Sequence, residues 1–248
     1  VALEVSAQAL SRHRVDGVHF DVVGYTNLSH DHFDDYTSFE EYFEAKARLF
    51  TPERAGRGVV LVDDAWGRRL ATQAKIPVTV VTMAGEGDAD WQCAITQQSP
   101  RSVSFVMTNR DGRSLRVSVP VVGAFMAANA AVAIAMLVEA GYDVEDIARV
   151  LERDGGIDVY IPGRGEIVSG DNGPVVYVDY GHTPDAFEGL LETLREVTDG
   201  RVFMVFGADG DRDTTKRHDM GSIAARGADV VIITDFHPRT EDPASIRA

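Results

Sequence analysis

The sequence predicts an α/β protein with two doubly wound domains, residues 1–160 and 161–248. The first observation behind this prediction is that strand-like apolar runs alternate with segments of helical spacing, which is typical of parallel sheets covered by helices. The second is the length of 248 residues, which exceeds that of a typical single domain. The hydrophobic content of 44% with 25% charged residues is ordinary for a globular protein.

In the first domain, apolar β-branched runs predict strands and segments with helical spacing predict helices. The strands are 19–26, 59–62 and 77–81, and the helices are 38–50 and 65–74. This alternation is expected of a parallel sheet.

A period-two pattern on both sides of the turn 109–112 predicts a β-hairpin from 102–108 and 114–119. Two helices follow it, at 127–140 and 143–153. Glycine comes directly after the first of these helices and soon after the second. We expect the domain boundary shortly afterwards, near residue 160.

The second domain has the order strand, helix, strand, helix, strand. Its predicted elements are 175–180, a helix that begins at Pro184 after the N-cap Thr183, 201–206, 216–226 and 229–234. This order predicts one doubly wound sheet with ligand-binding loops at the carboxyl ends of its strands. Polar clusters stand at those ends, at 179–184, 207–217 and 235–241, and could share one cleft.

Composition excludes several classes of protein. A net charge of -15 argues against a general nucleic-acid binder, because such proteins present a basic surface. The single cysteine, Cys93, cannot form an internal disulfide, which fits a reducing cytosolic setting. The sequence shows neither a transmembrane run nor a targeting signal. Because the run 1–5 reads as a buried strand and no initiator Met precedes it, we expect a fragment of a longer protein.

Four residues stand out by their position. Glu4 in that strand would carry a desolvation cost that a cation relieves, unless it lies at an exposed strand end. The loop that ends in His32 follows a strand and could bind a metal or phosphate, or be an ordinary polar loop. Lys46, on an apolar helix, must reach solvent or find an anion. Arg164, at the domain junction, could reach a phosphate or lie on the surface.

Seven blocks of sequence, in the right order, resemble the Mur ligase family, and within it the tripeptide synthetases of peptidoglycan synthesis. The blocks are 4–6, 13–15, 26–32, 45–50, 162–166, 178–186 and 210–213 with 216–217. The resemblance implies a P-loop-type ATPase domain with a β-hairpin insertion, followed by a Rossmann-like C-terminal domain.

The resemblance also implies an activity. It is that of an ATP-dependent amide ligase that adds meso-diaminopimelate, L-lysine or L-ornithine to UDP-MurNAc-L-Ala-D-Glu through an acyl phosphate. ATP and Mg²⁺ are the implied cofactors, and the UDP-MurNAc-dipeptide and the diamino acid are the implied partners. No nucleic acid and no membrane are expected, and the protein would be a cytoplasmic monomer.

The same resemblance implies roles for individual residues. Metal ligands would be Glu4, His32 and a carbamylated Lys46, and the catalytic residues would be Lys46, His182 and Lys216. The nucleotide would be bound by Asn129, Arg164 and Asp179. The substrates would be bound by Ser6, Arg14, Arg212, Phe236, His237 and Arg239.

The sequence departs from the family pattern at several points. No phosphate-loop signature occurs, and the family's N-terminal domain and final segment are missing, so we expect this chain alone to lack ligase activity. Met126 replaces an asparagine of the family, which leaves Asn129 as the nucleotide contact. Phe236 and His237 replace the pair that marks diaminopimelate-adding enzymes, so lysine or ornithine would suit the pocket as well.

Two other interpretations compete with this one. The first is a different ligase of the same superfamily, such as a folylpolyglutamate synthetase-like enzyme. The second is a relative that binds nucleotide precursors without turnover, which the changes at Met126, Phe236 and His237 motivate.

Overall fold

The computed structural model describes residues 1–29, 35–85 and 87–248. A six-stranded sheet dominates the first part of the chain, in the order β1-β2-β3-β4-β5-β6. Its strands are β1 (Phe20–Tyr25), β2 (Ala55–Leu61), β3 (Val78–Thr82), β4 (Trp91–Ser99), β5 (Ser102–Asn109) and β6 (Ser114–Val119). Strands β1 to β4 pair in parallel and β4 to β6 pair antiparallel, so that a parallel α/β sheet continues into an antiparallel extension.

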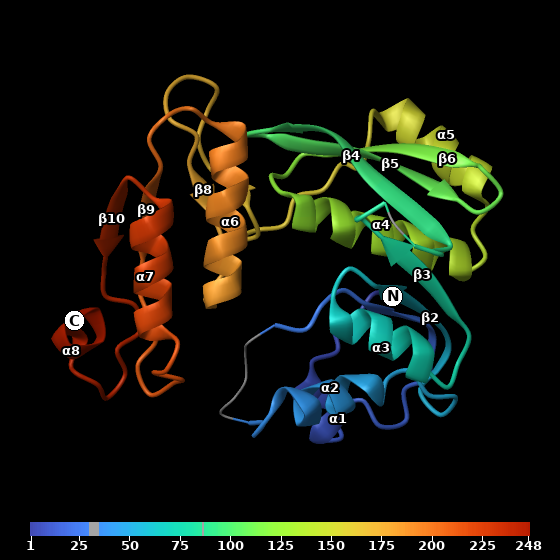
Figure 1. Ribbon diagram of the computed structural model, residues 1–248, viewed down its shortest axis with the longest axis horizontal. Coiled ribbons are helices and arrows are strands. Elements are labelled where there is room, and N and C mark those ends of the chain that lie inside the picture. Colours follow the sequence, from blue (N-terminus) through green and yellow to red (C-terminus); the bar gives the residue numbers. More distant parts are fainter. Residues whose placement is uncertain (30–34, 86) are drawn as a thin grey trace.

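Helices cover both faces of the parallel strands (Figure 1). They are α1 (Ala7–Ser11), α2 (Phe39–Ala47), α3 (Ala65–Gln73) and α4 (Ala124–Glu139), with α5 (Val144–Asp154) against β6. The consecutive residues Val59 and Val60 of β2 are both fully buried, the first in the core under α4 and the second in the core with α2. Because neighbouring side chains of a strand point to opposite faces, β2 is buried on both sides, as parallel strands are.

Local signals start the helices where the sequence predicted. Asp143 accepts the N–H of Glu145 at 2.9 Å and begins α5, and Thr183 accepts the N–H of Ala186 at 3.3 Å and begins the next helix. Each such cap stabilises a helix by about 1 kcal/mol. Gly155 follows α5 with a φ of 74°, a conformation that glycine adopts without strain.

The predicted strands and the hairpin of the first part are confirmed as β1, β2, β3, β5 and β6. Strand β4 was not predicted, although Trp91, Cys93 and Ile95 alternate with more polar residues and give the period-two signal of a strand.

The prediction that residues 1–5 form a buried strand is wrong. This segment has no regular structure, and Val1, Leu3 and Glu4 are exposed. No strand within the described ranges pairs with it, so its backbone polar groups remain with solvent. The desolvation argument for Glu4 therefore does not hold.

The second part of the chain contains two short sheets. Its elements are β7 (Glu166–Ile167), β8 (Tyr177–Val178), α6 (Pro184–Val197), β9 (Phe203–Phe206), α7 (Arg217–Gly227), β10 (Val230–Ile233) and α8 (Pro243–Arg247). Strands β9 and β10 pair in parallel, and the ring of Phe187 from α6 packs edge-on against Phe206 at 4.9 Å between centroids. The strand-helix alternation of an α/β fold is confirmed.

The predicted strand 175–180 is shorter than expected and pairs elsewhere. Only Tyr177 and Val178 are in β8, which pairs antiparallel with β7 and not with the β9–β10 sheet. In the described part of the chain, the predicted single doubly wound sheet is therefore divided between the β7–β8 sheet and the β9–β10 sheet.

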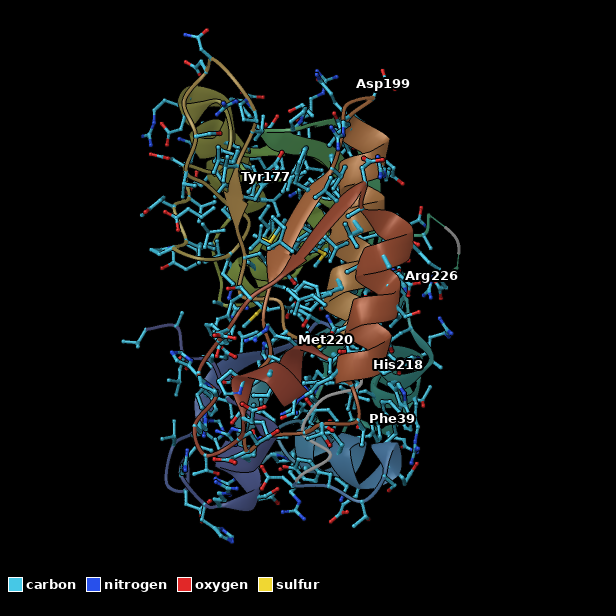
Figure 2. All side chains as sticks on the ribbon, turned by 90° about the vertical axis from the view of Figure 1, so that its left-hand side faces the viewer. Phe39, Tyr177, Asp199, His218, Met220 and Arg226 are labelled. Atoms are coloured by element: carbon cyan, nitrogen blue, oxygen red, sulfur yellow. The ribbon has the colours of Figure 1, made fainter. Side chains whose placement is uncertain are left out.

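The tip of the β4–β5 hairpin contacts the second part. The Tyr177 hydroxyl donates to the carbonyl of Pro100 at 2.5 Å, and Arg101 donates to the carbonyl of Gly170 at 2.6 Å. Figure 2 shows Tyr177 on β8, away from α7. Among the described helices, none is long and apolar enough to cross a membrane.

Candidate functional site

The carboxylate of Asp179 connects the end of β8 with two loops. One oxygen accepts the N–H of Gly165 and the other accepts the N–H of Gly181, each at 2.7 Å. Gly165 has a φ of 60°, a conformation that glycine adopts without strain. Asp179 thus orders the loop before β7 and the loop after β8.

Three exposed side chains from the same two loops contact one another: Arg164, Tyr180 and His182. The Arg164 guanidinium lies 4.7 Å from the centroid of the Tyr180 ring, and that ring meets the imidazole of His182 edge-on at 5.1 Å. The Nδ1 of His182 lies 3.0 Å from the carbonyl of Tyr180, so Nδ1 carries the proton and donates it. We call Arg164, Asp179, Tyr180 and His182 the β8 edge. A phosphate or an aromatic base can reach its guanidinium and rings.

A second polar site forms where the loops after β9 and β10 meet, and we call residues 207–213 and 234–241 the paired loops. Gly210 donates its N–H to the carbonyl of His237 at 3.0 Å. Thr240 donates its N–H and hydroxyl to the Asp211 carboxylate at 3.1 and 2.7 Å. A side chain at Gly210 would put its Cβ only 1.9 Å from the carbonyl oxygen of Pro238, so the close approach requires glycine.

An ion pair joins the paired loops to α7. Arg217 donates to both carboxylate oxygens of Glu241, at 2.8 and 2.9 Å, and to the carbonyl of Asp209 at 2.8 Å. The pKa of Glu241 is lowered to about 2, first by this guanidinium and then by the N–H of Asp211. Glu241 is therefore ionised across the whole physiological range.

The substrate candidates Phe236, His237 and Arg239 lie in the second of the paired loops. The ring centroids of Phe236 and His237 are 4.2 Å apart. His237 and Arg239 have φ values of 39° and 52°, in the left-handed region that these residues seldom adopt. The Oδ1 of Asp209 lies 3.5 Å from His237 Nδ1 and 3.7 Å from Arg239 Nη2, so a carboxylate faces both the imidazole and the guanidinium.

Arg212 is exposed in the first of the paired loops, and Lys216 is half-buried at the position before α7. The structure thus brings the four candidates Arg212, Lys216, His237 and Arg239 to one end of the β9–β10 sheet. Two of the three predicted polar clusters, 207–217 and 235–241, meet here, and the third follows β8, which belongs to the other short sheet.

The predicted magnesium ligands are Glu4, His32 and Lys46. Glu4 is exposed, and His32 lies outside the described residues. The ammonium of Lys46 lies 5.1 Å from the centroid of the Tyr42 ring, which stabilises the charged form by a cation–π contact. In the part of the chain that the structure describes, no group of three or more His, Cys, Asp and Glu is arranged to hold a metal ion.

The remaining candidates lie in the first part of the chain. Ser6 caps α1 by accepting the N–H of Ala9 at 3.1 Å, and Arg14 is exposed a few residues beyond this helix. Asn129 is exposed on α4, with its amide nitrogen 4.0 Å from the sulfur of Met126. Met126 therefore contacts the predicted nucleotide residue directly.

Sequence reasoning missed several residues of these sites. Tyr180, Gly210 and Arg217 were part of recognised blocks but received no role, and Asp209 and Glu241 were only counted within polar clusters. Charge alone does not show which acidic residue pairs with which arginine, because the pairing depends on how two loops distant in sequence meet.

Comparison with known proteins identifies the family. Residues 1–137 match the Mur ligase middle domain, and residues 163–248 match the Mur ligase glutamate ligase domain. The chain belongs to the Mur ligase family.

Similar proteins cover the whole chain. A UDP-N-acetylmuramyl-tripeptide synthetase of Leifsonia xyli subsp. xyli is 62% identical over 247 residues, covering 100% of this chain and 48% of that protein. A UDP-N-acetylmuramoyl-L-alanyl-D-glutamate–2,6-diaminopimelate ligase of Streptomyces coelicolor is 42% identical and covers 100% and 48%. A solved structure of a ligase of the latter name is 32% identical with a TM-score of 0.67, covering 98% of this chain and 50% of that chain. The chain spans about half the length of these relatives.

Proposed function

We propose that the complete protein is an ATP-dependent ligase that adds a diamino acid to UDP-MurNAc-L-Ala-D-Glu in peptidoglycan precursor synthesis. The observation that carries this proposal is the 62% identity, along the whole chain, to a relative named as a UDP-N-acetylmuramyl-tripeptide synthetase. The β8 edge and the paired loops support it, because they offer cationic groups for anionic substrates on a chain whose net charge is -15.

In this proposal ATP phosphorylates the terminal carboxylate of the D-glutamyl residue. That transfer produces ADP, and the amine of the diamino acid then attacks the acyl carbon, so that the amide forms, the bond to phosphate breaks and the amine loses a proton. The nucleotide would lie at the β8 edge, with Arg164 against a phosphate and Asp179 against the ribose. The two oxygens of Asp179 each accept one backbone N–H, and a carboxylate has about four acceptor positions, so a ribose hydroxyl can still bind there. Asn129 of α4 would add a further nucleotide contact.

The diamino acid would be bound by the paired loops. Arg239 can hold its α-carboxylate in a bidentate ion pair, and Arg212 would assist. Phe236 and His237 offer a ring and an imidazole in place of groups for a second carboxylate. Asp209, 3.5 Å from His237, adds a negative charge that a second carboxylate would meet, which favours lysine or ornithine over diaminopimelate.

The proposal includes further parts that rest on the family resemblance. Lys46, His182 and Lys216 would be catalytic, Ser6 and Arg14 would contact the UDP-linked substrate, and magnesium would be held by Glu4, His32 and a carbamylated Lys46. Residues 1–160 and 161–248 would be separate domains of a cytoplasmic monomer. Electron density at the Lys46 amine tests carbamylation directly, because the modification adds three non-hydrogen atoms.

The test of the proposed function is phosphate release by the complete protein with ATP, magnesium and UDP-MurNAc-L-Ala-D-Glu. Lysine, ornithine and meso-diaminopimelate are added one at a time. We expect release that depends on one of them, with lysine or ornithine more active than diaminopimelate. Release with diaminopimelate alone would contradict our interpretation of Phe236, His237 and Asp209.

The same assay separates the two competing functions. A folylpolyglutamate synthetase-like enzyme would release phosphate with a folate and glutamate but with none of the three diamino acids. A relative that only binds nucleotide precursors would bind ATP or the UDP-linked substrate in calorimetry without releasing phosphate. Either result would overturn the proposed function.

A further inference from the structure

We infer that Arg217 and Glu241 are positioning residues that hold the paired loops together, so that Arg239 presents its guanidinium to the amino acid substrate. This inference rests on the proposed function and assigns a role to an ion pair that does not itself contact the substrate. In this role the Arg217–Glu241 pair sets the geometry of the proposed amino acid site.

The Arg217–Glu241 pair contacts the first of the paired loops on both sides of the point where it meets the second. Arg217 donates to Glu241 twice and to the carbonyl of Asp209 once, at 2.8 to 2.9 Å. Glu241 accepts the N–H of Asp211 at 2.6 Å. Gly210 lies between these two anchored residues, and a Cβ added at Gly210 would lie 1.9 Å from the carbonyl oxygen of Pro238. The ion pair therefore fixes the backbone on both sides of this contact.

The Arg217–Glu241 ion pair is partly buried. The side chains of Arg217 and Glu241 are only 17% and 27% exposed, whereas those of Arg153 and Asp154, an ion pair at the end of α5, are 70% and 41% exposed. Solvent and salt screen an exposed pair strongly and a partly buried bidentate pair much less. The Arg217–Glu241 pair is therefore suited to keep one geometry.

The backbone close to this ion pair is strained in the second of the paired loops. His237 and Arg239, on either side of Pro238, both have positive φ values of 39° and 52°. Non-glycine residues keep such conformations only where the surrounding structure imposes them. Without the ion pair, these residues can relax to ordinary φ values, and a change of φ at Arg239 would turn its side chain away from its present direction.

The experiment uses the complete protein with the variants Glu241→Gln, Arg217→Lys and Arg217→Ala. We expect the KM for the diamino acid to rise about tenfold or more in Glu241→Gln and Arg217→Ala, because hydrogen bonds to charged groups are lost. Arg217→Lys keeps the charge and should fall between these variants and the wild type. The KM for ATP and for the UDP-linked substrate should stay within about twofold, as expected of a residue that acts only on the amino acid site.

The matched control is Arg226→Ala. Arg226 is on the same helix as Arg217 but at its other end, as its position relative to His218 in Figure 2 shows, and it donates to Ser222 of that helix. This variant should leave all three KM values unchanged. A Glu241→Gln variant with an unchanged KM for the diamino acid, or with equal increases for all substrates, would overturn the inference.

A second measurement keeps the inference separate from the proposed function. Hydrogen exchange without substrate should be faster in residues 207–213 and 234–241 of Glu241→Gln, and unchanged in Arg226→Ala. If the wild type releases no phosphate with any diamino acid, the proposed function fails while this measurement still tests the ion pair. Unchanged exchange in Glu241→Gln would then refute the positioning role.

Discussion

The carboxylate of Asp179 accepts the backbone N–H of Gly165 at 2.7 Å, across fourteen positions of sequence, and so ties the loop of Arg164 to the end of β8. Its other oxygen accepts the N–H of Gly181 at 2.7 Å. One half-buried side chain thus orders both loops of the β8 edge. In the proposed function the same side chain would contact the nucleotide, so its structural and binding roles can be separated only by graded substitution.

We predict that Asp179→Ala destabilises the protein by about 2 kcal/mol, because two charge-assisted hydrogen bonds are lost, and raises the KM for ATP. Asp179→Asn keeps one acceptor oxygen and should have an intermediate effect on both. Urea unfolding and phosphate release measure the two quantities. Asp171→Ala, at a side chain that is 96% exposed, is the control and should change neither. A stable Asp179→Ala protein with normal ATP dependence would refute both roles.

Tyr177 joins β8 to the tip of the β4–β5 hairpin through its hydroxyl. Tyr177→Phe removes this donor and leaves the carbonyl of Pro100 without it, so we expect a loss of about 1 kcal/mol in the free energy of unfolding. Denaturant unfolding measures it. Tyr142→Phe, at a residue that is 62% exposed shortly after the end of α4, should cost almost nothing. Equal effects of the two variants would show that the contact with Pro100 contributes no stability.

Two glycines near the paired loops should respond to alanine in opposite directions. At Gly210 the new Cβ would meet the carbonyl oxygen of Pro238 at 1.9 Å, so the loops must separate. We expect Gly210→Ala to cost about 1 to 3 kcal/mol and to weaken binding of the diamino acid. At Gly221, inside α7, a new Cβ would meet nothing within 4 Å beyond the adjacent backbone of its own helix, and alanine should stabilise the helix by up to about 1 kcal/mol. Thermal unfolding of both variants tests the prediction, which fails if Gly210→Ala is neutral.

The low pKa of Glu241 predicts a defined pH dependence. Because its pKa is lowered from 4.5 in an unfolded chain to about 2 in the folded protein, the carboxylate stabilises the fold above pH 4.5. That stabilisation decreases as the pH falls from 4.5 toward 2. The difference in Tm between the wild type and Glu241→Gln should therefore be constant at neutral pH and shrink across this interval.

Glu192→Gln, at an exposed glutamate of α6, is the control for this titration. Its Tm difference from the wild type should be small at every pH. A Glu241→Gln difference that stays constant from pH 6 to pH 2 would mean that the carboxylate of Glu241 has no special environment in solution.

The sequence alone determined the local structure. Caps such as Asp143 and Thr183 act on N–H groups two or three residues away, so their effect can be seen in a short stretch of sequence. The hairpin of β5 and β6 was predictable for the same reason, since both strands and the turn lie within one short segment. The ordered family blocks were also visible, and they pointed to the family that the comparisons then identified.

Only the tertiary structure decided which distant segments meet. Residues 1–5 have the composition of a buried strand, but a strand needs a partner, and no described strand pairs with them. The strand at Tyr177 pairs with β7, so β8 belongs to a different described sheet from the β9–β10 pair that carries the paired loops. The ion pair of Arg217 with Glu241 links residues 24 positions apart. Hydrogen bonds and ion pairs between such residues depend on the path of the chain, which local propensity does not contain.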